Sequence, residues 1–296
     1  QGADRGEWTG FNDFEGVTQA DYSEPVVYAI IEDAEAIREY DVSVYGTQVL
    51  NMSWDISSYI PTSGGSGAEG ITFVPDASLI ESGFVDGTGQ PRVSVNGMGG
   101  LIFVAHQNGG NIYVFDLNRN NGTLDFIGEY STSYNESAGL EFDRISHRLY
   151  IWHGGSHNKL EVTELSSTVA GAHRQLDSVI TYTQPHAGNL EGFARTQDDE
   201  PDQWVFLTID DGGSSSLDWY DWCFFTGDVD GNGVLTSDDA QSAFYFTLGW
   251  LEPDPRESCA ADCDGNGMIT AGDAQQIFFD VLGLGDGCVD GIGVTR

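Results

Sequence analysis

The stretch GLIFVAHQNGGNIYVFDL, residues 100–117, decides the fold. Two apolar runs, rich in β-branched and aromatic residues, flank an Asn-Gly-Gly turn, which predicts an antiparallel β-hairpin. Similar short runs recur up to about residue 220, namely PVVYAII (Pro25–Ile31), HRLYIWH (His147–His153) and QWVFLTI (Gln203–Ile209). No long stretch in this part has a clean helical period, so the sequence predicts a mainly β fold.

The hairpin belongs to a larger unit that recurs roughly every 50 residues. Each unit opens with a Glu-Gly or Gly-apolar step, and the four openings are DFEGVT at Asp13, GAEGITF at Gly67, SAGLEF at Ser137 and NLEGFA at Asn189. A strong apolar strand follows each opening, then a third strand of the IYVFDL kind and often a fourth. Four strands per unit at this spacing predict the blades of a small β-propeller.

The number of blades depends on the two ends of this region. The fourth unit stops at SSLDWYDW, residues 215–222, and lacks a fourth strand, which RGEWTGF, residues 5–11, is expected to supply. Such closure removes exposed sheet edges, so we expect four blades. Residues 82–97 belong to no unit, which leaves a five-bladed ring as the alternative. A β-sandwich is the competing fold.

The charge of the chain excludes several classes of partner. It carries 47 acidic against 11 basic residues, a net charge of -36. Such a protein repels nucleic acid and anionic membrane surfaces and attracts cations. No stretch approaches the roughly 20 apolar residues of a membrane span. The first residue, Gln1, is consistent with a secreted protein whose leader has been removed.

All four cysteines lie in the last quarter of the chain, at Cys223, Cys259, Cys263 and Cys288. An even number in a short segment predicts two disulfides and an oxidising, extracellular location. A zinc site using the close pair Cys259 and Cys263 is the alternative.

A second texture begins at residue 222, which predicts two domains, residues 1–221 and 222–296. Two runs have helical spacing, SDDAQSAFYFTLG (Ser237–Gly249) and AGDAQQIFFDVLG (Ala271–Gly283). Ser237 is the expected N-cap of the first, and a glycine ends each. We expect their apolar stripes to bury each other; the stripes consist of Ala240, Phe244 and Leu248 in the first run and Ala274, Phe278 and Leu282 in the second.

Each helical run follows an Asp/Asn/Gly-rich loop, and the two loops repeat at an offset of 34 residues, GDVDGNGVLTSDDAQ at 227–241 and ADCDGNGMITAGDAQ at 261–275. A twelve-residue loop supplies Ca²⁺ with oxygen ligands from positions 1, 3, 5, 7, 9 and 12. Both copies fill these positions, with Asp228, Asp230, Asn232, Val234, Thr236 and Asp239 in the first and Asp262, Asp264, Asn266, Met268, Thr270 and Asp273 in the second. The sequence therefore predicts two Ca²⁺ sites. It shows no helix before either loop, where DWCFFT and PRESCAA stand.

Paired loop–helix repeats with Asp at the twelfth position resemble a type I dockerin domain, a calcium-folded module of bacterial extracellular proteins. The resemblance covers about residues 223–290. It implies a cohesin-like protein partner. The aromatic junction LDWYDWCFFTGD, residues 217–228, contains no linker and favours instead a rigid unit that assembles with copies of itself in a homo-oligomer. Partner recognition would use loop positions 10 and 11, here Ser237, Asp238, Ala271 and Gly272. The ends of such a domain lie close together, which implies the disulfides Cys223–Cys288 and Cys259–Cys263.

The Glu-Gly steps place Glu15, Glu69 and Glu191 at similar positions, and these carboxylates are candidates for a site at the propeller axis. This feature faintly resembles phytase-like and gluconolactonase-like propellers, in which inward acidic residues bind Ca²⁺. The other candidate bases or ligands are His106, His153, His157 and His186.

Three functions follow from the sequence. The first is a secreted calcium-binding protein for binding or assembly without catalysis. The second is an extracellular hydrolase of the phytase-like or lactonase-like type. The third is a carbohydrate-binding propeller, for which Trp8, Trp54 and Trp152 are the candidate aromatic platform.

Overall fold

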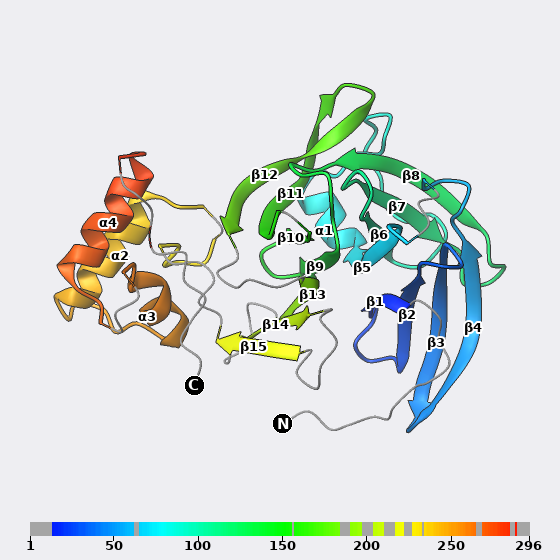
Figure 1. Ribbon diagram of the computed structural model, residues 1–296, viewed down its shortest axis with the longest axis horizontal. Coiled ribbons are helices and arrows are strands. Elements are labelled where there is room, and N and C mark those ends of the chain that lie inside the picture. Colours follow the sequence, from blue (N-terminus) through cyan, green and yellow to red (C-terminus); the bar gives the residue numbers. More distant parts are fainter. Residues whose placement is uncertain are drawn as a thin grey trace.

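The computed structural model describes residues 14–61, 65–155, 157–183, 190–196, 204–209, 217–221, 227–232, 234–264, 268–284 and 288. The fold is mainly β and propeller-like: strands β1 to β15 form successive antiparallel meanders, and helices α2, α3 and α4 lie beside them (Figure 1). The predicted domain boundary lies between residues 221 and 222. Residues 222–226 are outside the described part, so this boundary stays a prediction.

The first meander is a four-stranded sheet in chain order, with strands β1 (Phe14–Thr18), β2 (Val26–Ile31), β3 (Ala36–Val44) and β4 (Thr47–Asp55). A longer loop joins β1 to β2, and shorter turns join the other strands. The turn between β3 and β4 contains Gly46 at φ 68°, a left-handed conformation that glycine adopts without steric cost. The run PVVYAII thus forms β2, as predicted.

The second and third meanders merge into one eight-stranded sheet of order β5-β6-β7-β8-β12-β11-β10-β9. The second consists of β5 (Ala68–Pro75), β6 (Gly100–His106), β7 (Ile112–Leu117) and β8 (Leu124–Ser131), and the third of β9 (Gly139–Asp143), β10 (Arg148–His153), β11 (Lys159–Ala170) and β12 (His173–Thr183). A short parallel ladder joins their last strands, pairing Arg174 with Tyr130 and Gln175 with Ser131.

The last sheet has three strands, β13 (Leu190–Arg195), β14 (Trp204–Ile209) and β15 (Leu217–Asp221). Among the described residues this sheet contains no fourth strand, and residues 5–11, which were expected to supply one, lie outside the described part. Residues 82–97, the origin of the five-bladed alternative, hold no strand; they follow the short helix α1 (Asp76–Glu81) and contain only the isolated bridge between Val85 and Pro91.

The glycines of the first three opening steps lie where the first strands of neighbouring meanders approach each other closely. The neighbours are β1 with β5, β5 with β9, and β9 with β13. A β-carbon on Gly16 would lie 2.8 Å from the Glu69 carbonyl oxygen, and one on Gly70 would lie 2.8 Å from the Leu140 nitrogen. One on Gly139 would lie 3.1 Å from the Phe193 nitrogen. Side chains larger than hydrogen would separate these backbones.

Apolar side chains fill the space between neighbouring meanders. One cluster packs the first meander on the second and includes Tyr28, Trp54, Ile71 and Phe115. Another packs the second on the third and includes Phe103, Val114, Phe142 and Ile151. Trp54 and Trp152 are 1% and 0% exposed, so the prediction that they form a surface platform is wrong. Both belong to the core, and Trp8 lies outside the described residues.

Charged side chains also link the meanders. Arg195 of β13 contacts Asp143 of β9 at 2.8 Å, and both side chains are 0% exposed. The same guanidinium donates to the Tyr150 hydroxyl at 2.6 Å. Arg119, in the β7–β8 loop, donates through Nε to Glu39 of β3 at 2.6 Å. Such pairs fix the relative placement of the sheets because a buried charge without its partner is strongly destabilising.

The C-terminal part is helical and contains α2 (Ser237–Thr247), α3 (Pro255–Ala261) and α4 (Ala271–Val281), of which α2 packs on α4. Helices α2 and α4 were predicted, but the expectation of no helix at PRESCAA was wrong, because that stretch is α3. Asp254 caps this helix and Pro255 begins it, which is a usual helix start. The helix has only seven residues, so the sequence shows no helical period there. The N-cap of α2 is Thr236 rather than Ser237.

The buried face of the helix pair differs from the predicted stripe. Asp239, Ala240 and Ala243 of α2 are buried, as are Asp273, Ala274 and Ile277 of α4. The outer members of both predicted stripes, Phe244, Leu248, Phe278 and Leu282, are between 43% and 51% exposed. Small residues at the contact bring the helices together, and the larger side chains flank it.

Candidate functional site

Each Asp/Asn/Gly loop gathers three carboxylates. Ligand oxygens of Asp228, Asp230 and Asp239 all lie within 4.8 Å of one another, and the same holds for Asp262, Asp264 and Asp273. These are positions 1, 3 and 12 of the predicted loops. Two like charges at this spacing repel by about 3 kcal/mol at an effective dielectric constant of about 20. After Arg195, the sequence offers only Arg256 and Arg296 as basic residues.

The twelfth-position aspartates connect the loops to the helices. Asp239 is 0% exposed and accepts hydrogen bonds from the Thr236 backbone N–H at 2.8 Å and from the Asp230 backbone N–H at 3.1 Å. Thr236 in turn caps α2 and accepts from Asp238. One carboxylate therefore fixes the loop, the start of the helix and the cluster at once, which is a capping box with Asp in place of Glu.

The second loop repeats this arrangement. Asp273, 1% exposed, accepts from the Thr270 backbone N–H at 2.7 Å and from the Asp264 backbone N–H at 3.1 Å. Asp262 forms the C-cap of α3, so this helix delivers position 1 to its place. Among the other predicted ligands, Asn232, Val234, Thr236, Met268 and Thr270 lie in the loops, and Asn266 lies outside the described residues.

The donor set fits a divalent hard cation. Three carboxylates at close spacing supply oxygen ligands and a net negative charge, as Ca²⁺ prefers. Each cluster combines a buried aspartate at position 12 with an exposed one at position 3, so an ion would be held by the protein and reached from solvent.

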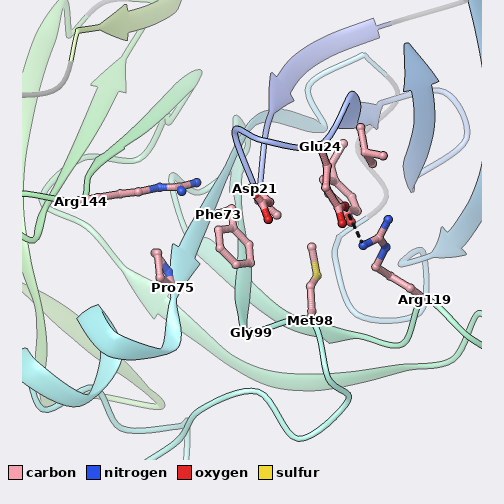
Figure 2. Close-up of a pocket in the computed structure, with 11 residues that line it drawn as sticks. Asp21, Glu24, Phe73, Pro75, Met98, Gly99, Arg119 and Arg144 are labelled. Carbon is pink, nitrogen blue, oxygen red and sulfur yellow. Dashed lines mark hydrogen bonds and ion pairs between the residues drawn. The ribbon is translucent and has the colours of Figure 1, made fainter. Parts of the chain in front are cut away.

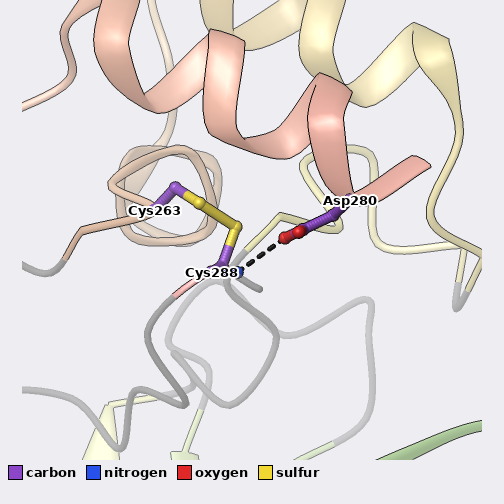
Figure 3. A group of neighbouring side chains, drawn as sticks. All are labelled: Cys263, Asp280 and Cys288. Carbon is purple, nitrogen blue, oxygen red and sulfur yellow. Dashed lines mark hydrogen bonds between the residues drawn. A yellow bond between two sulfur atoms is a disulfide. The ribbon is translucent and has the colours of Figure 1, made fainter. Parts of the chain in front are cut away.

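A disulfide lies beside the two loops (Figure 3). It joins Cys263 to Cys288 across a sequence separation of 25 residues, and the Asp280 carboxylate accepts a hydrogen bond from the Cys288 backbone N–H at 2.6 Å. The predicted pairs Cys223–Cys288 and Cys259–Cys263 are therefore wrong. Cys259 is also disulfide-bonded, and Cys223 lies outside the described residues. Because Cys259 and Cys263 are both oxidised, the zinc alternative is wrong as well.

The carboxylate site at the propeller axis stays a prediction. Glu15 is exposed and Glu69 is 8% exposed, and neither belongs to a group of three ligand-type side chains there. The side chain of Glu191 lies outside the described residues. The first three opening steps share a glycine that permits close approach of the next first strand.

His153, one of the candidate bases, forms a closed internal network. Its Nε2 lies 2.9 Å from a Glu161 carboxylate oxygen, and its Nδ1 lies 3.2 Å from the Ser137 hydroxyl. Ser137 donates to the Gly110 carbonyl at 2.8 Å, and all three side chains are 0% exposed. The trio resembles a nucleophile with its base, but it is sealed from substrate and holds the second and third meanders together. Glu161 carried no recognisable signal in the sequence.

Comparison with known proteins adds little to these observations. No family model matches the chain, and no curated protein matches it. Among solved structures, it is similar to a chain in the crystal structure of a nidogen/laminin complex, with 12% sequence identity and a TM-score of 0.37. The alignment covers 71% of this chain and 60% of that one. None of the described helices is long and apolar enough to cross a membrane.

Proposed function

We propose that this chain is an extracellular calcium-binding protein in which a four-bladed β-propeller carries a C-terminal docking module of the dockerin type. The observation that carries the proposal is the duplicated cluster of three carboxylates, each linked to a helix start by the same hydrogen bonds. The Cys263–Cys288 disulfide supports an oxidising location.

Calcium binding follows from the cost of leaving these clusters without a counter-charge. A Ca²⁺ ion in each loop would offset the mutual repulsion of the three carboxylates. It would also bind roughly six to eight oxygen ligands. Because the same aspartates begin α2 and α4, ion binding would also stabilise the helix pair.

Calorimetry on chelator-treated full-length protein tests the two sites. We expect two Ca²⁺ ions per wild-type chain and one in each of the variants Asp228→Ala and Asp262→Ala. The matched control is Asp238→Ala, because Asp238 is an exposed neighbour outside the cluster, and it should still bind two. Two ions bound by Asp228→Ala would show that the first site is wrongly assigned.

A docking role is supported by exposed apolar residues that recur at the same offset as the loops. The pairs are Val234 with Met268, Phe244 with Phe278, Leu248 with Leu282, and Trp250 with Leu284, all between 41% and 74% exposed. Large exposed apolar patches mark protein interaction sites, which is the role that we propose for these residues. The positions predicted for recognition, Ser237, Asp238, Ala271 and Gly272, are also exposed.

Particle size measured by light scattering tests docking between copies of this chain, and capture by an immobilised cohesin domain tests a cohesin-like partner. In calcium we expect either a particle larger than the monomer or capture by the cohesin domain. Whichever is observed should be lost after chelation and in the double variant Phe244→Ser/Phe278→Ser. The control is Val169→Ser, which removes an apolar residue that is 75% exposed on β11. A monomer in calcium that no cohesin captures would contradict the docking proposal while leaving the calcium sites standing.

A further inference from the structure

A cavity of about 360 Å³ opens where loops of the first three meanders meet (Figure 2). No residue of the helical segment lines it. The lining comes from the β1–β2 loop and the start of β2, the end of β5, the residues before β6, and the β7–β8 and β9–β10 loops. Its volume lies at the small end of the range for ligand pockets, roughly 300 to 1,000 Å³.

The charged groups of the lining balance one another. Asp21 and Glu24 supply carboxylates, and Arg119 and Arg144 supply guanidinium groups. Arg119 donates to Glu39 and lies 3.3 Å from Glu24. The chain has only 11 basic residues, so the presence of two at one small cavity is not a general property of its surface.

Arg144 is held in a fixed position across the cavity wall. Its guanidinium lies 4.1 Å from the centre of the Tyr22 ring and 5.5 Å from that of Phe73. Its Nη2 donates to the Gln19 carbonyl oxygen at 2.7 Å. In Figure 2 the Arg144 side chain extends toward Asp21 and Phe73 from one side, while Arg119 and Glu24 lie at the other. Fixed polar groups of this kind bind a ligand at low entropic cost.

Between the charged groups the lining is apolar. Phe73 and Tyr28, which are 4% and 1% exposed, belong to the lining, and Met98, Val26 and Pro75 complete this surface. The Tyr28 hydroxyl donates to Glu39 at 2.9 Å, which fixes the ring. The cavity thus offers hydrogen-bond acceptors, hydrogen-bond donors and a hydrophobic floor.

We infer that this cavity binds a neutral carbohydrate of about one or two sugar rings. The charges of the lining cancel, and the field of a chain with net charge -36 disfavours anions. None of the acidic clusters found among the described residues lies here, so a metal ion is not the expected ligand. A sugar carries hydroxyl donors and acceptors on its edge and C–H groups on its face, which match both parts of the lining.

Ligand-detected NMR and calorimetry on the full-length protein in calcium test this inference. The probes are glucose, galactose, mannose, maltose, cellobiose and lactose, with galacturonate and glucosamine as charged comparisons. We expect saturable binding of at least one neutral sugar, weaker or absent binding of both charged sugars, and an affinity that changes less than about twofold with salt. No binding of the neutral sugars, or equal binding of a charged one, would overturn the inference.

Variants locate the binding. Glu24→Gln and Arg144→Met should each weaken it by about tenfold or more, as expected for hydrogen bonds to charged groups. The controls Glu164→Gln and Arg148→Met remove an ion pair of 2.6 Å outside the cavity and should leave affinity unchanged. Asp21→Asn, in an exposed loop, serves as a further variant if Arg144→Met fails to fold. Unchanged affinity in folded cavity variants would refute the site.

The inference does not rest on the calcium-dependent docking function, and chelator treatment separates the two. Sugar binding should persist in the chelator because no cavity residue comes from the two predicted calcium loops, residues 228–239 and 262–273. Loss of sugar binding in the chelator would refute its assignment to this cavity.

Discussion

Replacing Gly70 with alanine tests whether the opening glycines hold the first strands together. The added β-carbon would lie 2.8 Å from the Leu140 nitrogen and 2.9 Å from the Gly139 carbonyl carbon, shorter than the 3.4 Å at which ordinary contact begins. Both obstructing atoms belong to the backbone, so no side chain can rotate away. Strands β5 and β9 must separate instead.

Overpacking of this kind typically costs about 1–3 kcal/mol. For a body of this size, that corresponds to a fall in melting temperature of roughly 3–10 °C. Urea unfolding followed by tryptophan fluorescence gives the free energy of unfolding from the midpoint and slope. A loss of about 1–3 kcal/mol with an unchanged slope is the expected result.

Gly87→Ala is the matched control. Its β-carbon would lie 3.3 Å from Gly128 Cα and 3.5 Å from the Ile127 carbonyl oxygen, distances that small shifts relieve. We expect it to cost less than about 1 kcal/mol. If Gly70→Ala is no more destabilising than Gly87→Ala, the close approach of β5 and β9 does not explain the repeated glycine.

Three further changes have defined outcomes. Arg195→Met leaves the buried carboxylate of Asp143 without its cation and should lower the free energy of unfolding by about 3–5 kcal/mol in chemical denaturation, and adding Asp143→Asn should restore part of it. Burial raises the pKa of Glu161, but hydrogen bonds from His153 and serines lower it below the ordinary 4.5, so its stabilisation is present above pH 4.5 and is lost as pH falls through the lower folded value. The stability of Glu161→Gln should therefore decline less than that of the wild type between pH 5 and pH 3, roughly, and an equal decline would contradict this. Replacing Cys263 by serine opens a 25-residue link and should destabilise the helical segment by about 3 kcal/mol, measured by calorimetry in calcium.

The sequence predicts the strands well because their signal is local. The runs around residues 26–31, 100–106, 112–117, 148–153 and 204–209 all form strands, since β-branched and aromatic residues between turns favour extended backbone. The duplicated loops and the helices after them are equally local. Their acidic positions 1, 3 and 12 come together as the spacing predicts.

The predictions that were wrong depended on spatial relations. The Cys263–Cys288 pair depends on where α3 and α4 bring their ends, which spacing does not determine. Trp54 and Trp152 are as suitable for a core as for a binding surface, and only the packing of the sheets distinguishes the two. Phe244 and Phe278 lie at helical spacing, but alanines form the buried face between the two helices. Both phenylalanine rings therefore remain partly exposed. The cavity collects residues from five separate segments and has no sequence signature.

The parallel ladder between β8 and β12 affects which strands unfold together. Because Tyr130 and Ser131 pair with Arg174 and Gln175, the last strands of the second and third meanders protect each other's edges. Neither can detach without disrupting its neighbour, so their backbone amides should exchange with deuterium as a single cooperative unit. The first meander has no such ladder among the described residues, and β4 ends at an exposed edge. The backbone amides of this edge should therefore exchange before those of the eight-stranded sheet.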